Sequence, residues 1–495
     1  MQVSFHGSDA VASDTPLLAV AVPEGSSAGE GPLADLDALL GGAVTRLLES
    51  GDLKGRIRDE VVLYPAAGGP RRVALLGVGK DTDFDAEQVR RFAARAVRIA
   101  ERLGVQSLSI RLDGLGRSET GVLAQAGAEG AVLAAWRFTE LKQPPEEGLT
   151  QVTEVRFFAD GDGALLAEGV RVGEIVARAQ NLARTLQSRP GNVATPSHLA
   201  DEARRVAAAC GLGVTVFDED RLLREGMHAI LAVSQGSDQE ARLIVLEHKG
   251  GTEGEAPLVL VGKGVTFDAG GISIKPAPGM EDMKYDMSGG AAVIAAMQAV
   301  AELGVKANVV GIVPSSENLL NGRAVKPGDV IRTLAGKTVE VINTDAEGRL
   351  ILADALAWGA RLKPAAMVDC ATLTGAVLIG LGRHAAAVMS NDDALSEELR
   401  AAGARSGERC WPLPLWPEYT KQLESETADL MNVGGRDGGA ITAACFLKEF
   451  VGDTPWAHLD IAATAYGDGK LPYQRKGGYG FPVRLFVDWV RSRAG

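Results

Sequence analysis

Apolar and polar positions alternate in blocks along residues 1–160. The short runs rich in β-branched residues read LLAVAV, EVVLYP, RVALLGV, SLSIRL and EVRFFA. Helical stretches are expected between them, at about 32–49, 84–103 and 119–139. This strand–helix rhythm predicts an α/β layer. No cluster of acids or histidines in these residues looks catalytic.

A longer helical stretch follows at about 164–188 and ends in SRPGNVATP, where Pro190, Gly191 and Pro196 break the helix. The rhythm then resumes with GVTVFD, ARLIVLEH, PLVLVGKG, NVVGIVP, VEVIN and AAMVDCATL. These runs are almost continuously apolar, which is typical of central strands that have helices on both faces. Sheets of this kind bind ligands at the carboxyl ends of their strands.

Two domains are expected because 495 residues are too many for one ordinary hydrophobic core. Apolar residues make up 46% of the chain and charged residues 23%, the balance of a soluble globular protein rather than a disordered or fibrous one. We predict a smaller N-terminal α/β domain, a linker helix, and a larger C-terminal α/β domain with a mixed, mostly parallel sheet. The predicted bounds are, in that order, 1–163, 164–190 and 191–495.

The net charge of −13 at pH 7 weakens any non-specific attraction to nucleic acid or an anionic membrane, although it leaves room for a local basic patch. The amino terminus lacks the basic and apolar segments of a signal peptide. The longest apolar helical run, 291–305, contains Gln298 and Glu302 and is too short to span a bilayer. We therefore expect a cytoplasmic protein that does not enter the membrane.

The cysteines lie far apart, mostly in apolar runs such as MVDCATL and ITAACFL. This spacing indicates buried thiols rather than a disulfide framework or a zinc site. The four residues are Cys210, Cys370, Cys410 and Cys445.

Charged residues follow several of the strand-like runs in the second half of the chain. They are Lys263 after LVLVG, Asp268 and Lys275 in VTFDAGGISIK, Asp286 after EDMKY, and Asp345, Glu347 and Arg349 after VEVIN. In an extended segment, residues i and i+2 point the same way. Asp345 and Glu347 could therefore converge on one centre, as Arg349 could if the extended conformation continues.

The acids each have an ordinary structural alternative. Asp286 could cap a helix that begins at Met287. Asp268 could close an Asx turn before Gly270.

The cations have such alternatives too. Lys263 could face solvent, and Glu347 and Arg349 could form a surface salt bridge. Taken together, however, four acids and three cations stand at the ends of apolar strands. Isolated buried charge is costly there unless it is paired or binds metal.

Charge counting favours a site for two metal ions. Four carboxylates balance two divalent cations, and such a pair with a bridging water generates hydroxide near neutral pH. Lys263 could be a ligand only as the neutral amine, which requires the ions to depress its pKa strongly. Lys275 and Arg349 remain as positive charges that suit an anionic transition state or a small bound anion.

The segments VGKGVTFDAGGISIKP, MKYDMSGGAAV and NTDAEGRLILADAL closely resemble the leucyl (cytosol) aminopeptidase family, and NTDAEGRL is highly specific. The resemblance also covers NVATPSHLADEA, GRAVKPGDVI, DCATLTGA, DLMNVGGRDGGAITAACFLKEFV and WAHLDIAATA, and so spans essentially 165–495. The N-terminal part matches in size and α/β character only. Ala269 and the run from Ser288 to Gly290 depart mildly from the pattern and remove no ligand.

The resemblance implies a hydrolase that releases leucine and other apolar residues from the N-terminus of peptides, as in peptide turnover. It assigns one ion to Lys263, Asp268, Asp286 and Glu347, and the other to Asp268, Asp345 with its main-chain carbonyl, and Glu347. Lys275 would polarise the scissile carbonyl, and Arg349 would hold a bicarbonate that acts as general base. Since the ligands include no histidine, Mn²⁺, Zn²⁺ and Mg²⁺ all remain open, with Mn²⁺ or Zn²⁺ expected.

The resemblance also implies a homohexamer, built as a dimer of trimers, and a side-chain pocket. The pocket residues would be Met283, Thr372, Leu373, Gly375, Ala462 and Ala465, which by sequence alone are ordinary core candidates.

Other hypotheses are weaker. A two-metal phosphoesterase would use the same carboxylates, and a DNA-binding regulator, known among bacterial members of the family, is disfavoured by the acidic charge. LLGVGK lacks the full phosphate-loop spacing. His384 and His458 stand alone in apolar context, which favours hydrogen-bonded structural roles.

Overall fold

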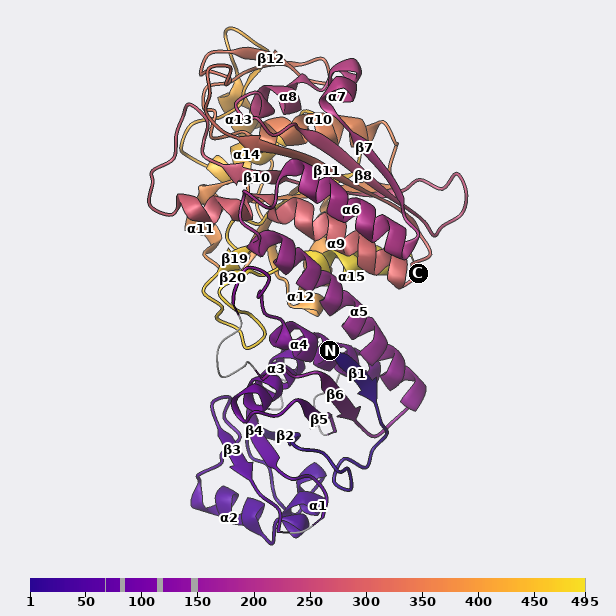
Figure 1. Ribbon diagram of the computed structural model, residues 1–495. Coiled ribbons are helices and arrows are strands. Elements are labelled where there is room, and N and C mark those ends of the chain that lie inside the picture. The colour runs from indigo at the N-terminus through magenta and orange to yellow at the C-terminus, as the bar shows by residue number, and fades with distance from the viewer. Residues whose placement is uncertain (67, 81–84, 114–118, 144–149, 495) are drawn as a thin grey trace. The chain divides into compact units, whose positions relative to one another are not determined.

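The computed structural model describes residues 1–66, 68–80, 85–113, 119–143 and 150–494 (Figure 1). Two compact units divide the chain. One comprises Met1–Arg178 with Gly469–Arg475, and the other Ala179–Asp468 with Lys476–Gly495. The helix α5 (Gly163–Ser188) contributes residues to both.

The first unit contains a six-stranded sheet with the order β1-β6-β5-β2-β4-β3. All neighbours pair in parallel except β3 and β4, so the sheet is mixed. The strands are β1 (Gln2–Phe5), β2 (Leu18–Pro23), β3 (Glu60–Leu63), β4 (Val73–Gly79), β5 (Ser107–Arg111) and β6 (Glu154–Phe158). The predicted runs therefore all form strands, and β1 is an addition.

The helices of this unit correct one expectation. The stretch 32–49 forms two helices, α1 (Pro32–Leu39) and α2 (Ala43–Ser50). Gly41 and Gly42 between them adopt φ of 59° and 79°, values that end a right-handed helix. The other helices are α3 (Ala86–Arg102) and α4 (Thr120–Ala135). Residue 84, where the second helix was expected to begin, lies outside the described residues.

The second unit is built on a nine-stranded sheet with the order β16-β15-β18-β14-β9-β11-β8-β7, in which β10 also pairs with β11. β9 pairs in parallel with β11 and β14, and β14 with β18, whereas β8 is antiparallel to both of its neighbours. The strands are β7 (Gly213–Phe217), β8 (Arg242–Lys249), β9 (Leu258–Gly262), β10 (Gly264–Asp268), β11 (Asn308–Asn318), β14 (Ala366–Ala371), β15 (Ala386–Ser390), β16 (Cys410–Pro412) and β18 (Trp456–Asp460).

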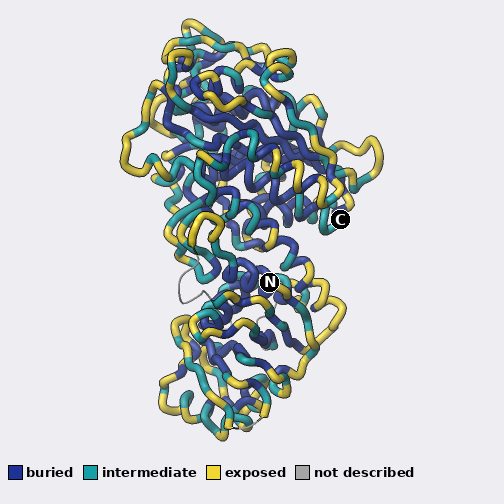
Figure 2. Tube along the Cα trace, in the orientation of Figure 1, coloured by how far each residue is buried: buried dark blue, intermediate teal, exposed yellow. Residues whose placement is uncertain are grey.

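The central strands of the large sheet are more deeply buried than its edge strand β7, and Figure 2 shows the buried centre of this unit in dark blue. Every residue of β9, β14 and β18 is buried, which confirms the central position expected for two of these runs. Only Phe217 of β7 is buried, because β7 is an edge strand, so the expectation that GVTVFD is central was wrong.

VEVIN also differs from its prediction. Its ordered part is β13 (Thr338–Glu340), which lies outside the large sheet, between β12 (Val330–Arg332) and β17 (Leu430–Met431). Val339 and Val341 are buried, while Glu340 between them is half-buried and Ile342 is exposed. This alternation buries one face only, as a small outer sheet requires.

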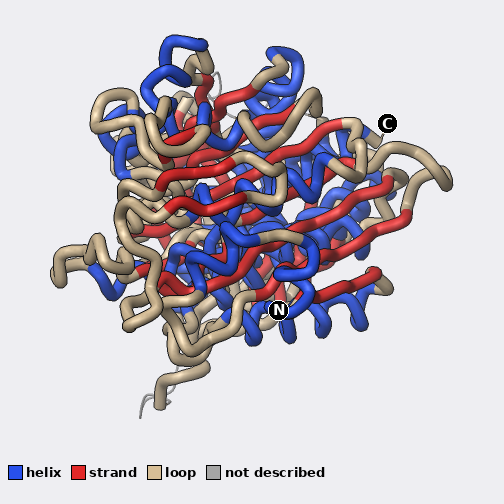
Figure 3. Tube along the Cα trace, turned by 90° about the horizontal axis from the view of Figure 1, so that it is seen from above, coloured by secondary structure: helices blue, strands red, loops and turns tan. Residues whose placement is uncertain are grey.

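Helices cover both faces of the large sheet (Figures 1 and 3). α6 and α9 pack on one face, and α8 and α10 on the other. Their bounds, with those of two further helices, are α6 (Pro196–Cys210), α8 (His228–Ser234), α9 (Ser288–Glu302), α10 (Gly348–Ala360), α14 (Gly439–Lys448) and α15 (Val483–Arg493). The α/β fold class with a larger second part is thereby confirmed.

The structure also bears on the predictions about membrane spans and cysteines. Among the described helices, none is long and apolar enough to cross a membrane. The four cysteines form no disulfide; three are buried as expected, and Cys210 is half-buried.

Candidate metal centre

Four chain segments meet at the carboxyl ends of the central strands. Lys263 directly follows β9, and Asp268 is the last residue of β10. Asp286 lies in the 3₁₀ helix η2 (Met280–Met287), and Glu347 is the residue before α10. The start of α9 lies very close to β14: a Cβ on Gly289 would lie 2.1 Å from the carbonyl oxygen of Cys370. The glycines after Asp286 therefore let α9 approach the strands closely.

Lys263 lies at the centre of one group of contacts. Its Nζ is 2.7 Å from Oδ2 of Asp286 and 2.7 Å from Oε1 of Glu347, and it donates a hydrogen bond of 3.1 Å to the carbonyl oxygen of Thr372. The Thr372 hydroxyl donates to Oδ1 of Asp286 at 2.7 Å. Since Lys263 is only 3% exposed, the alternative of a solvent-facing lysine is wrong. The carboxylate of Asp286 contacts Lys263 and Thr372 and does not cap α9, whose N-cap position is Met287.

Lys275 joins a second group. Its Nζ lies 2.7 Å from Oδ2 of Asp268 and 2.5 Å from Oδ1 of Asp345. The other oxygen of Asp268 accepts hydrogen bonds from the main-chain N–H of Gly270 at 2.9 Å and from Nδ2 of Asn318 at 2.8 Å. The predicted Asx turn at Asp268 is therefore present. It uses only one carboxylate oxygen, and the second oxygen contacts Lys275.

Asp345 and Glu347 do not converge through an extended backbone. Glu347 has φ of −77° and ψ of −35°, which are helical values, and α10 follows at once. The two carboxylates instead face different lysines, Lys275 and Lys263. Ligand oxygens of Asp268, Asp286 and Glu347 all lie within 4.8 Å of one another, so these three acids form one cluster.

Several oxygens of this site fit a divalent cation. Asp286 Oδ2, Asp345 Oδ1 and Glu347 Oε1 are buried and have no hydrogen-bond partner within the described part of the chain, although each lies at ion-pair distance from a lysine. Hard cations such as Mn²⁺ and Mg²⁺ prefer such carboxylate ligands.

Burial and neighbouring charges shift the pKa values of the acids and of Lys263. Burial raises the pKa of Asp268 to about 6, with Glu347 adding repulsion. Burial likewise raises the pKa of Asp286 and of Glu347. For Lys263, burial lowers the pKa, but the neighbouring carboxylates outweigh it and the net pKa is raised. The ammonium group thus supplies the positive charge that the cluster needs.

Arg349 lies on the first turn of α10 and is buried. Its Nη1 donates a hydrogen bond of 2.8 Å to the carbonyl oxygen of Asn432, whereas its Nε has no hydrogen-bond partner among the described residues. Burial lowers its pKa to about 10, so it is still a cation at neutral pH. The side chains of Glu347 and Arg349 form no ion pair in the described structure, and neither is on the surface, so the surface salt-bridge alternative is wrong.

The predicted pocket residues come mostly from two neighbouring loops. Thr372, Leu373 and Gly375 follow β14, and Ala462 and Ala465 follow β18, its parallel neighbour. Met283 is half-buried on η2.

Asp460, the last residue of β18, ties the two loops together. Its Oδ1 accepts the N–H of Leu373 at 3.3 Å and of Ala462 at 3.2 Å, and its Oδ2 accepts the Thr374 hydroxyl at 2.6 Å. Sequence reasoning missed this residue, although an acid directly after the apolar run WAHL gives the same signal as Asp268 does.

Neither of the two singled-out histidines belongs to the acid cluster. Nδ1 of His458 is 2.6 Å from Oδ1 of Asp369, and the indole N–H of Trp456 donates to the other oxygen at 2.8 Å. All three side chains are fully buried, and His458 is hydrogen-bonded through Nδ1 as expected, while its Nε2 has no hydrogen-bond partner among the described residues. His384 is exposed.

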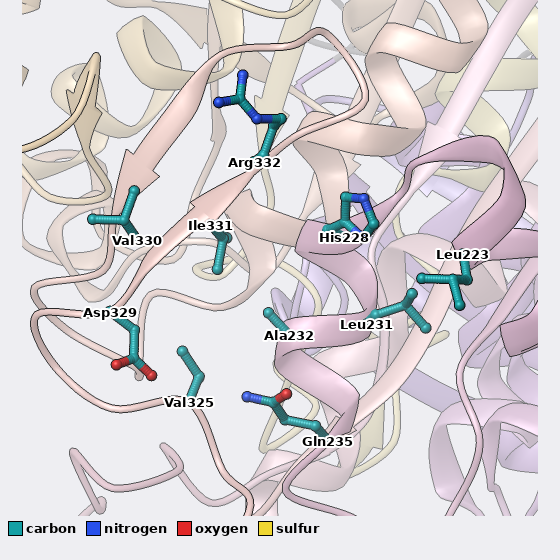
Figure 4. Close-up of a pocket in the computed structure, with 10 residues that line it drawn as sticks. All are labelled: Leu223, His228, Leu231, Ala232, Gln235, Val325, Asp329, Val330, Ile331 and Arg332. Carbon is teal, nitrogen blue, oxygen red and sulfur yellow. The ribbon is translucent and has the colours of Figure 1, made fainter.

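A separate cavity of about 500 Å³ lies between α8 and the segment 325–332. Figure 4 shows its lining, which includes His228, Gln235 and Asp329 and none of the predicted site residues.

Comparisons with known proteins cover almost the whole chain. Residues 181–487 match the catalytic domain of the cytosol aminopeptidase family, and residues 19–145 match its N-terminal domain. The N-terminal likeness therefore exceeds the size and α/β character expected from sequence.

Individual proteins of known sequence or structure also match over nearly the full length of the chain. The chain is 43% identical to a probable cytosol aminopeptidase of Geobacter sulfurreducens over 99% of both chains, and 43% identical to one of Roseiflexus castenholzii over 99% of this chain and 100% of the other. Among solved structures, a mutant of tomato leucine aminopeptidase superimposes with a TM-score of 0.89 at 30% identity, covering 99% of this chain and 96% of that one. The bottromycin maturation enzyme BotP in complex with Mn superimposes with a TM-score of 0.86 at 34% identity, covering 97% and 100%.

Proposed function

Since the chain belongs to the cytosol aminopeptidase family, we propose that it cleaves the first residue from peptides with two divalent ions bound at the acidic centre. The family assigns the aminopeptidase activity; the number of ions and the roles of individual residues are the proposal. The observation that carries it is the buried cluster of Asp268, Asp286 and Glu347, whose ligand oxygens lie within 4.8 Å of one another. When bound, such ions supply an activated water and a Lewis acid for the carbonyl oxygen.

The ligand sets share two acids. One ion is assigned to Lys263, Asp268, Asp286 and Glu347, and the other to Asp268, Asp345 and Glu347. Asp286, Asp345 and Glu347 each keep a buried oxygen that has only a lysine at ion-pair distance and no hydrogen bond within the described part of the chain, which supports their assignment as ligands. The Mn complex of BotP supports a divalent ion in a protein of the same fold.

The two lysines differ in a way that separates their roles. Each lysine contacts two acids, but the side chain of Lys263 is 3% exposed, whereas that of Lys275 is 19% exposed. Lys263 is therefore suited to a fixed ligand, which it can be only after it loses its proton. Lys275 stays cationic and can reach a substrate. We assign it to polarising the scissile carbonyl and to stabilising the oxyanion that forms there.

Arg349 is assigned to the general base. A guanidinium holds a planar oxyanion through paired hydrogen bonds, and Nε of Arg349 is a buried donor without a partner among the described residues. Bicarbonate matches this geometry and can accept the proton of the attacking water.

The preference for leucine and other apolar N-terminal residues rests on the two loops that Asp460 joins. Their side chains at Thr372, Leu373 and Ala462 are half-buried and small or apolar. A pocket of this kind discriminates by the methylene groups it buries, each worth about 0.8 kcal/mol.

Chelation and reloading test the proposal. The protein is stripped with a chelator, reloaded separately with Mn²⁺, Zn²⁺ and Mg²⁺, and assayed on a panel of aminoacyl amides and on a phosphate ester. We expect no activity after stripping, recovery on leucine amide with Mn²⁺ or Zn²⁺ at two ions per chain, and no hydrolysis of the ester. Full activity with less than one ion per chain contradicts the two-ion site.

A further inference from the structure

Asn432 is a fully buried residue directly after β17, one of the two edge strands of the small three-stranded sheet. The register of that sheet pairs Met431 with Glu340 on β13. The N–H of Asn432 continues the ladder by donating to the carbonyl oxygen of Glu340 at 3.0 Å. The side chain of Asn432 is thereby placed where the chain leaves β13 and enters the segment 341–347.

The Asn432 side chain binds that segment with both ends of its amide. Oδ1 accepts the N–H of Ile342 at 2.8 Å and that of Asn343 at 3.3 Å. Nδ2 donates to the carbonyl oxygen of Asn343 at 2.7 Å and to that of Ala346 at 3.5 Å. Two acceptor sites and two donors are the full capacity of a primary amide, and all four are used within one short segment.

The main chain of Asn432 contacts Arg349. Its carbonyl oxygen accepts the hydrogen bond from Nη1 of Arg349 at 2.8 Å. One residue thus contacts, through different atoms, the segment that carries Asp345 and Glu347 and the guanidinium two residues further on.

The segment between β13 and α10 needs such support because it is irregular. Its internal bonds form a single turn, in which the Asp345 N–H donates to Oδ1 of Asn343 at 2.9 Å and the Ala346 N–H to the carbonyl oxygen of Asn343 at 3.2 Å. A turn of this size does not fix the direction of two carboxylates by itself. Asn432 attaches it to the small sheet, and Asn318 attaches it to the large sheet by donating to the carbonyl oxygen of Thr344 at 3.0 Å.

We propose that Asn432 is a positioning residue that sets the placement of Asp345 and Glu347 for divalent-ion binding and, independently, the placement of Arg349. The inference rests on the proposed assignment of these two acids as ion ligands. Groups that orient metal ligands typically change metal affinity or activity by about 10- to 100-fold when they are lost. The side chain and the main chain of Asn432 make separable contributions, because only the former is removed by substitution.

Asn432→Ala tests the side chain. We expect Mn²⁺ affinity, measured by competition with a chromogenic chelator, to fall by about 10- to 100-fold. We also expect the stimulation by added bicarbonate at saturating Mn²⁺ to persist, since the carbonyl oxygen that holds Arg349 remains. Wild-type Mn²⁺ affinity in this variant overturns the inference.

Asn432→Asp is the second variant, chosen because a side chain of the same size is less disruptive to folding than alanine. It keeps the size of the side chain and an acceptor for the N–H groups of Ile342 and Asn343, but it replaces the two donor bonds by contacts between oxygens. Its Mn²⁺ affinity is expected to fall as well, and unchanged affinity in a folded Asn432→Asp protein overturns the inference.

Asn308→Ala is the matched control. Asn308 begins β11, at the opposite end of that strand from the metal centre, and holds a loop in the same manner. Its Oδ1 accepts the N–H of Gly251 at 3.2 Å, and its Nδ2 donates to the carbonyl oxygens of Thr252 at 2.8 Å and Glu255 at 3.2 Å. We expect its loss to lower thermal stability and to leave Mn²⁺ affinity unchanged. An equal loss of affinity in Asn308→Ala means general destabilisation and overturns the inference.

Failure of the proposed function gives a different result. In that case wild-type protein and Asp345→Asn bind Mn²⁺ equally, whatever Asn432→Ala does. Loss of Mn²⁺ in Asp345→Asn with wild-type affinity in Asn432→Ala leaves the ligand assignment standing and rejects only the role of Asn432.

Discussion

Nζ of Lys263 lies 2.7 Å from Oε1 of Glu347, and both side chains are almost completely buried. Without bound ions, the lysine is the counter-charge of the acid cluster. A divalent ion bound at the same acids would supply that charge in place of the ammonium group. If Lys263 is a ligand as proposed, ion uptake should release its proton.

Lys263→Ala is expected to destabilise the ion-free protein. The substitution leaves Asp286 and Glu347 buried without their main counter-charge, a change that typically costs about 3–5 kcal/mol. Urea denaturation of chelated wild type and variant measures the difference. Coincident unfolding curves would show that the ion pairs contribute nothing to folding.

Asp345→Asn and Glu347→Gln are expected to lose activity by orders of magnitude while the fold is retained, because each removes a charge that the ions need. Rates on leucine amide and circular dichroism measure the two effects. The control is Glu426→Gln, since Glu426 is an exposed acid outside the site. Near-normal rates in both variants would mean that the ligand assignment is wrong.

Arg349→Ala is expected to keep both ions and to lose kcat by about two to four powers of ten, the usual worth of a positioned general base. Added bicarbonate should stimulate wild type more than the variant. Arg349→Lys keeps the charge but lacks the planar fork, so it should recover little of the loss. An equal response to bicarbonate in wild type and Arg349→Ala would assign Arg349 to a structural role.

The family resemblance predicts a hexamer. Light scattering should therefore give a mass of about six times the 51.6 kDa of one chain. A stable and fully active monomer contradicts this expectation.

Asp354 gives a pH dependence of stability outside the metal centre. Its buried carboxylate accepts the N–H groups of Ala229, Ile230 and Leu334, and burial raises its pKa to about 7 from the ordinary value of 3.8. The folded protein thus holds this proton more tightly than the unfolded chain. The stabilising contribution of the proton is complete below about pH 4 and is lost as the pH rises to about 7.

Comparison with Asp354→Asn isolates this group. The stability of wild type relative to the variant should decline by a few kcal/mol between about pH 4 and pH 8, since one pKa unit corresponds to about 1.4 kcal/mol. Urea denaturation at a series of pH values measures the decline. A difference that does not change with pH would exclude a raised pKa at Asp354.

The sequence alone determined the class of the fold and singled out charged residues that come together at the acid cluster. Apolar runs and their periods depend on residues near in sequence, so strands such as β9 and β14 could be predicted from their own composition. Charges that end such runs, among them Lys263 and Asp268, could be singled out because burying them has a cost that only a partner or an ion offsets.

The tertiary structure alone decided how these residues meet. The 32–49 stretch divided at two glycines, VEVIN joined a small outer sheet, and Glu347 became helical, so the alternation rule failed where it was applied to Asp345 and Glu347. Asn432 and Asn343 are separated by 89 positions in the chain yet share hydrogen bonds. Local patterns carry no information on such pairs, because the pairing of β13 with β17, two strands far apart in sequence, brings them together.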